Sequence, residues 1–381
     1  MHQAAHSSRI LELIRARIAA AGGWLPFDAY MQMALYEPGL GYYSAGAHKL
    51  GRGGDFTTAP EMSPLFGRCL ARHCTEVLGA LGSGYVLEIG AGSGRLAFDV
   101  LSSMAECNAL PERYLILEIS ADLRARQQTL LGSLPEPLAA RVQWLDAPPP
   151  EDWQGALLAN EVLDALPVEC FAWRDGQLRE RGVAVDADGA LCWQERAASE
   201  SLCAEVQRLR DDVNVAWPSG YTSELCLRTA AWLEEVTRTL SQGVALFIDY
   251  GLPRRDYYHA QRAAGTLRSH YRQQAHDDPF AHPGMEDLTA WVDFTRVAEG
   301  ADAAGLEVLG FTTQTALLLG LGIEADVAAA HDERTRVARA GEARRLLMPD
   351  EMGENFKAIA LGRGWQRPLA GFVLQDQRAR L

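Results

Sequence analysis

The spacing of hydrophobic positions changes near residue 85. Upstream of it, apolar residues recur at helical spacing and predict helices over residues 8–22, 27–36 and 63–81. Downstream of it, short apolar runs alternate with helical segments. That alternation is typical of an α/β fold, in which a parallel sheet carries helices on both faces.

Five apolar runs are predicted to form the parallel strands. They lie near residues 85–90, 114–119, 141–145, 155–160 and 243–249. About 80 residues separate the fourth run from the fifth, which is more than one crossover helix needs. Their pattern predicts a hairpin-like section and helices, one of them over 229–240. We therefore expect a large insertion at the carboxyl edge of the sheet, where such folds bind ligands.

The C-terminal part is predicted to complete the sheet. A polar, His-rich loop follows the fifth strand, and a helix is expected over 285–304. Residues 306–311 and 356–361 are expected to form a final antiparallel pair, with a lid-like helical insertion at about 312–354. The predicted organisation is a helical N-terminal extension and lid (1–82), a cofactor-binding core (83–168 and 241–365), an inserted substrate- or partner-binding subdomain (169–240) and a tail (366–381).

Composition and charge limit the function classes. The net charge is −14 over 381 residues, which argues against a general binder of nucleic acid or of anionic membranes. The seven cysteines include no C-x-x-C pair and suit free thiols in a reducing cytoplasm. No apolar run reaches about 18 residues, so no membrane insertion is expected. These features predict a cytoplasmic protein.

A glycine-rich turn follows the first predicted strand and indicates a nucleotide-like ligand. Gly90, Gly92 and Gly94 stand at alternate positions after Glu88. Glycines let the backbone turn sharply and approach a ligand closely, and a helix that begins near Gly94 directs free N–H groups at that ligand. Two registers fit the turn. Gly92, Gly94 and Ala97 match the dinucleotide fingerprint, whereas Glu88–Gly94 reads E-x-G-x-G-x-G and resembles motif I of class I S-adenosylmethionine (SAM) methyltransferases.

Acids at the next two strand ends add to this candidate cofactor site. Glu118 ends the second predicted strand, 24 residues after Gly94. A carboxylate there can accept both ribose hydroxyls, in NAD and SAM folds alike. Asp146 follows the third strand, where this fold often contacts the adenine ring, although it can equally be a loop acid before Pro148. Glu118 therefore supports a ribose-bearing ligand without deciding between the two cofactors.

Five ordered segments together resemble one family. They are residues 54–63 (GDFTTAPEMS), 88–94 (EIGAGSG), 159–168 (ANEVLDALPV), 248–251 (IDYG) and 287–294 (DLTAWVDF). Their order and content are similar to those of the MidA-type SAM-dependent methyltransferases. That family includes the mitochondrial complex I assembly factor that methylates an arginine on a core subunit. The similarity implies a class I methyltransferase fold with an insertion, SAM as methyl donor, and a protein substrate that resembles a respiratory complex I subunit.

The fourth strand ends in Asn160 and Glu161, beside the methyl group in a class I layout. A guanidinium stays protonated in water, so an arginine acceptor must be oriented and polarised by carboxylates. Glu161 and Asp164 lie three positions apart, on one face if a helix begins there. We predict both acids as catalytic and Asn160 as a cofactor contact. The alternative is that Asn160 caps the following helix and the acids favour its dipole.

Further positions extend the candidate site. The family similarity makes Asp55 a cofactor contact in an N-terminal lid. Asp249 ends the fifth strand on the ligand side and is predicted to touch the acceptor, with simple strand termination as the alternative. His270, His276 and His282 share one polar loop, but their spacing is not a recognised zinc pattern. We therefore expect a substrate-covering loop there and no metal.

The sequence thus predicts a SAM-dependent methyltransferase that acts on an arginine side chain of a protein partner. One alternative is an NAD-dependent oxidoreductase that uses the Gly92, Gly94 and Ala97 register. The other is a non-catalytic assembly factor that keeps the fold for partner binding. Nucleic acid is not expected as a partner, and a homodimer stays open.

Overall fold

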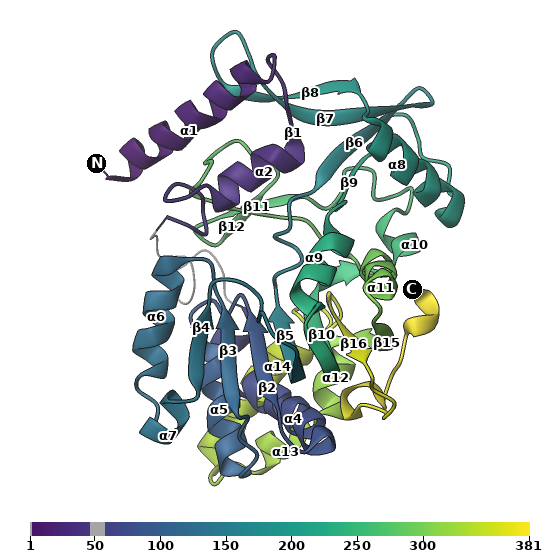
Figure 1. The fold of residues 1–381 in the computed structure, drawn as a ribbon. Helices are drawn as coiled ribbons and strands as arrows, with labels where there is room; N and C mark the ends of the chain where they lie inside the picture. The colour runs from purple at the N-terminus through teal and green to yellow at the C-terminus, as the bar shows by residue number, and fades with distance from the viewer. Residues whose placement is uncertain (1, 46–57) are drawn as a thin grey trace.

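A mixed sheet organises one half of the protein. The computed structural model describes residues 2–45 and 58–381 (Figure 1). The order of the strands in this sheet is β15-β16-β10-β5-β2-β3-β4. Their bounds are β2 (Tyr85–Ile89), β3 (Arg113–Leu117), β4 (Val142–Leu145), β5 (Trp153–Asn160), β10 (Leu240–Leu252), β15 (Glu307–Thr313) and β16 (Phe356–Arg363). All five strands predicted as parallel are present, with small shifts at their ends.

The pairing of the strands brings their carboxyl ends to one edge. β2 pairs in parallel with β3 and β5, β3 with β4, and β5 with β10. β16 lies antiparallel between β10 and β15, which confirms the predicted final pair. A short strand, β14 (Val292–Asp293), adds a parallel pair at the end of β10. Because β2–β5 and β10 run the same way, the loops that follow them meet at this carboxyl edge.

Alternate residues of the strands pack on opposite faces of the sheet. In β2, Val86 belongs to the core shared with α4 (Pro64–Leu81) and α5 (Arg95–Glu106). Leu87 belongs to the core shared with α9 (Thr229–Thr237) and α11 (Phe294–Ala303). Both residues are fully buried. A largely parallel sheet needs helices on both faces, which explains its continuous apolar strands. The connection from β3 to β4 carries α6 (Ala121–Leu131) and α7 (Glu136–Ala139).

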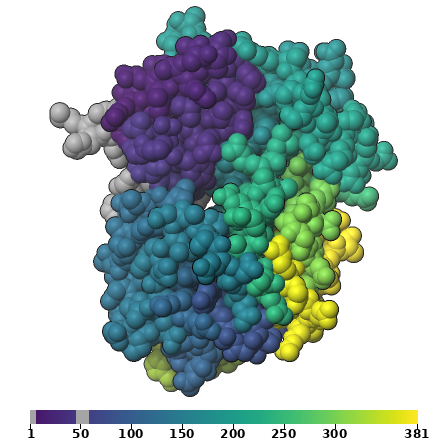
Figure 2. All heavy atoms as spheres, viewed as in Figure 1, coloured from purple at the N-terminus to yellow at the C-terminus, as the bar shows by residue number. Residues whose placement is uncertain are grey.

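The N-terminal residues and the insertion form a second lobe over the carboxyl edge. Its elements are α1 (His2–Ala20), β1 (Leu25–Pro26), α2 (Phe27–Tyr36), β6 (Glu169–Arg174), β7 (Gln177–Val185), β8 (Leu191–Ala197), α8 (Glu200–Val213) and β9 (Thr222–Leu225). β6, β7 and β8 pair antiparallel, as the hairpin-like pattern predicted, and β1 joins them on β7. This lobe lies above the sheet in Figures 1 and 2, with the N-terminal helices beside the insertion.

The chain after β10 differs from the prediction. Instead of one helix over 285–304, β13 (Asp287–Thr289) and β14 come first, and α11 begins only at Phe294. The Asp293 carboxylate fixes that start, because it accepts the N–H groups of Thr295 and Arg296 at 3.0 and 3.2 Å. After α10 (Arg254–Tyr257), the predicted His-rich loop contains a small sheet of β11 (Arg268–Tyr271), β12 (Gln274–His276) and β13.

The predicted lid over 312–354 is helical but is placed elsewhere. It consists of the helices α12 (Gln314–Gly320), α13 (Ile323–Ala328) and α14 (Glu333–Leu347), which pack with α4 against one face of the sheet. Arg72 of α4 pairs with Asp326 of α13 at 2.7 Å. The predicted helical content is present, and the helices cover one face of the sheet, which does not support a lid-like role. The predicted tail, with η1 (Ala370–Phe372) and η2 (Arg378–Arg380), contributes the buried Phe372 to the same core.

Two global properties follow from the described residues. Among them, no helix has both the length and the hydropathy that a membrane crossing requires. All seven cysteines carry free thiols, and Cys69, Cys74 and Cys170 are buried.

Candidate functional site

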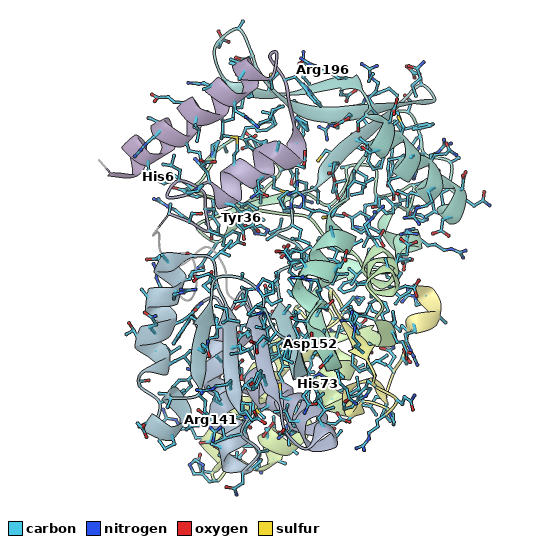
Figure 3. All side chains as sticks on the ribbon, viewed as in Figure 1. His6, Tyr36, His73, Arg141, Asp152 and Arg196 are labelled. Carbon is cyan, nitrogen blue, oxygen red and sulfur yellow. The ribbon has the colours of Figure 1, made fainter. Side chains whose placement is uncertain are left out.

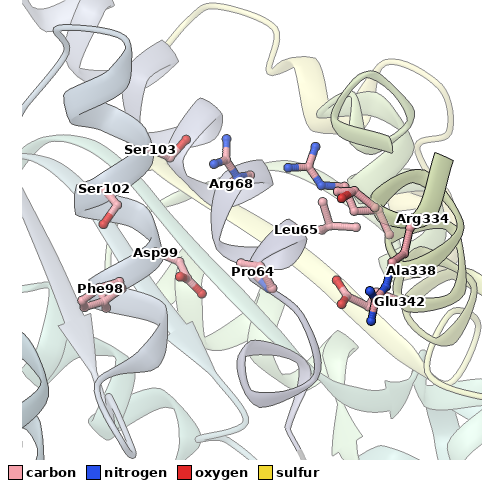
Figure 4. A pocket seen from close by; sticks show the side chains of 12 residues that line it. Pro64, Leu65, Arg68, Phe98, Asp99, Ser102, Ser103, Arg334, Ala338 and Glu342 are labelled. Atoms are coloured by element: carbon pink, nitrogen blue, oxygen red, sulfur yellow. The ribbon is translucent and has the colours of Figure 1, made fainter. Parts of the chain in front are cut away.

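Two cavities on the described surface are candidates for the site, one at the carboxyl edge and one away from it. The second, about 470 Å³, runs along the outer side of α4, and all its lining residues belong to α4, α5 and α14 (Figure 4). Its acids already have partners. Asp99 accepts a hydrogen bond from Arg95 Nε at 2.8 Å, and Glu342 accepts one from Ser63 Oγ at 2.7 Å. We therefore locate the candidate site in the cavity at the carboxyl edge.

That cavity is a cleft of about 570 Å³ between the sheet and the N-terminal lobe. Its floor consists of the glycine turn after β2 and the ends of β3 and β5. Its opposite wall comes from α2 with the tyrosines that follow it, α9 and β13. Tyr36 lies on this wall, at the end of α2 that faces the sheet (Figure 3). The cleft thus joins segments that are far apart in the sequence.

The glycine turn has the backbone that its sequence predicted. Gly90, Gly92 and Gly94 adopt φ values of 67°, 53° and 86°, a left-handed conformation that favours glycine. A Cβ on Gly90 would lie 3.0 Å from Val162 Cγ2, so a side chain there would press on the loop after β5. Gly94 is the N-cap of α5, whose N-terminus therefore faces the turn. Gly90 and Gly92 line the cleft, whereas Gly94 packs against Gln127.

Glu88 lies in the cleft floor just before this turn. The side chain is 3% exposed and accepts a 2.6 Å hydrogen bond from the Tyr114 hydroxyl. Burial raises the pKa of Glu88 to about 7, the Tyr114 hydrogen bond opposes that rise, and the charge of Glu118 adds to it. A bound cation beside Glu88 would restore its charge.

A hydrogen-bond network that the sequence did not reveal fixes Glu118 in the cleft. Gln127 of α6, fully buried, donates from Nε2 to Glu118 Oε2 at 2.9 Å and to the Gly92 carbonyl at 2.9 Å. Trp144 Nε1 donates to Gln127 Oε1, also at 2.9 Å. Gln127 therefore ties the glycine turn to the acid on β3. In the sequence it is one polar position of an otherwise polar helix and carries no signal of this role.

The short helix α3 (Ala59–Met62) brings the N-terminal segment onto the turn. Its Glu61 lines the cleft and accepts a hydrogen bond from Ser93 Oγ in the glycine turn. The backbone N–H of Ala59 donates to the Glu161 carboxylate. α3 thus contacts both the turn and the loop after β5. Asp55, predicted as a cofactor contact, lies outside the described residues.

The loop after β5 carries the two acids predicted as catalytic. Glu161 has φ of 55°, a left-handed conformation that costs a non-glycine residue roughly 1–2 kcal/mol. Its N–H donates to the Ile248 carbonyl at 2.9 Å, and its Oε1 accepts from Asn160 Nδ2 at 2.9 Å. Asn160, Glu161 and Asp164 all line the cleft. No helix follows directly, so the reading of Asn160 as a helix cap is wrong.

Asp249 does not reach the cleft. It is fully buried, and Oδ2 accepts the backbone N–H groups of Val162, Leu163 and Asp164 at 3.1, 2.9 and 3.2 Å. Oδ1 accepts the N–H of Tyr250 at 2.9 Å. The predicted contact between Asp249 and the acceptor is therefore wrong, because the side chain is buried and its Oδ2 holds the loop that presents Glu161 and Asp164.

Both loop acids resist ionisation. Burial, followed by the charge of Asp164, raises the pKa of Glu161 to about 8, while the hydrogen bonds from Asn160 and Ala59 oppose this rise. Burial also raises the pKa of Asp164, to about 6. Asp164 is 5% exposed, and its Oδ1 has no hydrogen-bond partner among the described residues. The loop therefore holds two carboxyl groups whose charge a cation in the cleft would stabilise.

The opposite wall contains groups that sequence reasoning missed. Tyr43 donates from its hydroxyl to Asp287 Oδ2 at 2.8 Å, and Asp287 lines the cleft. Tyr36 donates to the Ala165 carbonyl at 2.9 Å. Arg228 at the start of α9 closes one side of the cleft, where it pairs with Asp28 at 2.8 Å. The motif at 287–294 signalled this segment without indicating that its acid faces the glycine turn.

The tertiary structure also changes the prediction for Asp146. Asp146 is not a lining residue of the cleft, and its side chain, 89% exposed, pairs with Arg124 at 2.6 Å. An adenine contact is therefore not supported for Asp146. Among residues 2–45 and 58–381, no group of three or more His, Cys, Asp or Glu side chains is close enough to hold a metal ion. His276 instead pairs with Glu286 at 3.1 Å.

Comparison with known proteins identifies the cofactor. A family model described as "Putative S-adenosyl-L-methionine-dependent methyltransferase" matches residues 69–312, more than half of the chain. The chain is similar to a Burkholderia thailandensis protein whose crystal structure contains bound S-adenosylhomocysteine, with 42% identity, a TM-score of 0.94, and coverage of 99% of this chain and 97% of that one. A second structure from that organism gives 41% identity and a TM-score of 0.91 with the same coverage.

More distant relatives have a named activity. The chain is 28% identical over 382 residues to the zebrafish mitochondrial protein arginine methyltransferase NDUFAF7, covering 92% of this chain and 86% of that protein. It is 27% identical over 369 residues to the human protein of the same name, covering 87% and 78% respectively.

These matches decide between the two registers of the glycine turn. The dinucleotide reading, with Gly92, Gly94 and Ala97, is wrong, because the family and its cofactor-bound relative use SAM and its product. The SAM reading, with Glu88, Gly90, Gly92 and Gly94, agrees with them. The chain therefore belongs to this family of SAM-dependent methyltransferases, similar to NDUFAF7, and its cofactor is S-adenosylmethionine.

Proposed function

We propose that the protein transfers a methyl group from SAM to an arginine side chain of a protein partner, and that this partner resembles a respiratory complex I subunit. The observation that carries the proposal is the position of Glu161 and Asp164 in the same cleft as the glycine turn and Glu118. The relatives named as protein arginine methyltransferases support the choice of acceptor.

The residues of the cleft floor fit the cofactor. Glu88 is a buried acid able to face an ammonium group, and the turn at Gly90 and Gly92 leaves the backbone open to a ligand. Glu118, fixed by Gln127, suits the ribose hydroxyls. We propose these residues, together with Gly94 behind the turn and Asn160, as the cofactor-binding set. When bound, SAM supplies an electrophilic methyl group on a sulfonium.

The acids of the loop after β5 would prepare the acceptor. A guanidinium offers five N–H donors in a plane, so two carboxylates can fix both its position and its rotation. Glu161 and Asp164 provide such a pair at the cleft surface. Orientation of this kind converts a rare encounter into a frequent one and can supply much of the rate enhancement.

Glu161 also suits the proton that must leave the acceptor nitrogen. After a nitrogen gains a methyl group, one N–H proton has to pass to a base. The pKa of Glu161, raised by burial to about 8, makes it a stronger base than an ordinary carboxylate and keeps it partly ionised near neutral pH. We propose Glu161 as the catalytic base and Asp164 as the residue that orients the guanidinium.

A labelled-methyl assay tests this function. Purified protein is incubated with methyl-labelled SAM and lysate depleted of the native enzyme, and the labelled product is hydrolysed and analysed for methylarginine. We expect one labelled protein with the wild type and at most about 1% of its labelling rate with Glu161→Gln, since a base contributes about 10²–10⁴-fold.

Cofactor binding provides the control. Glu161→Gln should bind S-adenosylhomocysteine as the wild type does, because the change leaves the turn and Glu118 in place. Label on a residue other than arginine would overturn the acceptor assignment. Binding of S-adenosylhomocysteine without any labelled product would favour a non-catalytic assembly factor instead.

A further inference from the structure

The wall opposite the glycine turn carries an acid that the mechanism above does not use. Asp287 in β13 is 4% exposed and lines the cleft. The Tyr43 hydroxyl donates to its Oδ2 at 2.8 Å. Tyr43 follows α2, and Asp287 lies in β13, which packs against α2, so the pair lies within the part of the protein that covers the sheet. The contact gives Asp287 a fixed orientation at the cleft surface.

Two tyrosine rings lie beside this acid. Tyr36 and Tyr43 stack with ring centroids 5.5 Å apart and an interplanar angle of 24°. The Tyr36 hydroxyl donates to the Ala165 carbonyl at 2.9 Å, next to Asp164 in the chain. Burial is the main cause of the raised pKa of Tyr36 and of Tyr43. The charges of Asp287 and Asp164 raise the pKa of both hydroxyls further. Two acids and two rings therefore share one part of the cleft.

One of these acids lacks a hydrogen bond that its burial calls for. Asp164 is 5% exposed, and its Oδ1 accepts no hydrogen bond from the described residues, although the nearby Tyr250 hydroxyl lowers the pKa of this carboxyl. A buried carboxylate oxygen without a donor is costly. Because Asp164 lines the cleft, a ligand there can supply the donor.

The chemistry of the wall selects the kind of ligand. A metal ion needs several ligands within a few ångströms of one point, and no cluster of acids in the described residues meets that requirement. A planar cation with several separated N–H donors suits spaced carboxylates better. Guanidinium groups also stack on aromatic faces, which the Tyr36 and Tyr43 rings offer.

Building on the proposed arginine methylation, we propose that Asp287 and Asp164, with the Tyr36 and Tyr43 rings, form the subsite that binds the guanidinium of the acceptor. Asp287 is then a specificity-determining residue that recognises the charge and width of this group. Tyr43 is a positioning residue, because it acts through the hydrogen bond to Asp287. Asp287 and the two tyrosines belong to the wall opposite the glycine turn, so loss of Asp287 should leave cofactor binding intact.

Calorimetry with small probes tests the subsite without knowledge of the natural partner. The full-length protein is saturated with S-adenosylhomocysteine and titrated with L-argininamide or with L-citrullinamide, whose side chain has a similar shape and no charge. We expect argininamide to bind about tenfold or more tightly than citrullinamide, since charge-assisted hydrogen bonds are about twice as strong as neutral ones. Asp287→Asn should lower the affinity for argininamide at least about tenfold. Tyr43→Phe should lower this affinity by a smaller factor.

A matched control comes from another buried acid with a tyrosine partner. Glu224 accepts a 2.8 Å hydrogen bond from the Tyr257 hydroxyl, and neither residue lines the cleft. Glu224→Gln should therefore keep the wild-type affinity for argininamide if the effect of Asp287→Asn belongs to the subsite. Affinity for S-adenosylhomocysteine should stay the same in the Asp287, Tyr43 and Glu224 variants.

The outcomes separate this inference from the proposed function. Equal binding of argininamide and citrullinamide by the wild type overturns the subsite even if Asp287→Asn does not fold. Wild-type affinity for argininamide in a folded Asp287→Asn overturns it as well. Failure of the wild type to bind S-adenosylhomocysteine would instead contradict the methyltransferase function, whatever the subsite does.

Discussion

The Asp249 carboxylate accepts the backbone N–H of Leu163 at 2.9 Å, across 86 positions of sequence. The same oxygen accepts the N–H groups of Val162 and Asp164. A residue predicted to touch the acceptor thus acts from beneath the loop that carries Glu161 and Asp164. The arrangement resembles an anion held by a nest of backbone donors, with the anion supplied by the neighbouring strand.

Replacing Asp249 by asparagine tests this supporting role. One amide oxygen replaces two carboxylate oxygens, and the amide N–H₂ group faces backbone donors, so about 2 kcal/mol of stability should be lost. Methyl transfer should fall at least about tenfold, because Glu161 is displaced. Affinity for S-adenosylhomocysteine should change little. Chemical denaturation, the labelled-methyl assay and calorimetry measure the three quantities, and an unchanged free energy of unfolding would refute the role.

The Gln127 network leads to a prediction about the cofactor. Gln127→Ala removes the donor to both Glu118 and the Gly92 carbonyl, so affinity for S-adenosylhomocysteine should fall about tenfold. Gln128, the next residue on the same helix, is exposed and supplies the control. Gln128→Ala should bind like the wild type by calorimetry. Equal affinities for the two variants would show that Glu118 does not depend on Gln127.

Gly90 offers a test of the close approach behind the turn. Gly90→Ala places a Cβ 3.0 Å from Val162 Cγ2 at a φ of 67°, so it combines backbone strain with a steric contact. Gly305 has a similar φ of 72° with open space around it, and Gly305→Ala should cost only the backbone part, roughly 1–2 kcal/mol. Gly90→Ala should destabilise more and also weaken S-adenosylhomocysteine binding.

Adding Val162→Ala to Gly90→Ala should recover part of that loss, because the shortened side chain removes the contact. Denaturant unfolding of the four proteins measures the stabilities. If Gly90→Ala and Gly305→Ala lower the free energy of unfolding equally, and both bind S-adenosylhomocysteine as the wild type does, the contact between Gly90 and Val162 has no such role.

The raised pKa of Glu161 predicts how stability depends on pH. In the native state the pKa of Glu161 is about 8, whereas in the unfolded chain it is about 4.3. Between these values the native state binds more protons, so the contribution of Glu161 to stability declines as pH rises from about 4.3 to about 8. Glu161→Gln should flatten this part of the profile, as measured by denaturation at several pH values.

Glu88 provides an internal comparison for this experiment. Burial raises the pKa of Glu88 to about 7. Its contribution to the free energy of unfolding therefore also declines as pH rises, but the decline ends at a lower pH than that of Glu161. Glu88→Gln should therefore flatten the profile below about pH 7 and leave the decline between about pH 7 and 8. An unaltered profile in Glu161→Gln would contradict a native-state proton on Glu161.

Local patterns were sufficient for most elements of the fold. The helix over 27–36 and the strand from Tyr85 are where periodicity predicted them, because apolar spacing reports directly on burial. The segment after β10 was not predictable in this way. Residues 287–293 have the apolar content of a helix, but they pair with β11 and with the end of β10, and these partners are distant in sequence.

For the candidate site residues too, local sequence patterns predicted some roles, whereas others depend on tertiary packing. The backbone of the turn at Gly90–Gly94 has positive φ values, which favour glycine. The alternate glycines after a strand therefore predict this turn from the sequence. Asp249 and Asp146 are equally good strand-end acids in the sequence. Only packing makes one a buried support for the loop after β5 and leaves the other exposed beside Arg124.

The alternating α/β order, the glycine turn and the acids that end β3 and β5 were all predictable from the amino-acid sequence. These features depend on the backbone and on periodicity within a few residues of each other. The tertiary structure alone decided which side chains share the cleft: Gln127 beneath Glu118, Asp249 beneath Glu161, and the Tyr43–Asp287 pair across from the turn. Such contacts join segments 9 to 244 positions apart, and their energy exists only after the chain has closed those loops.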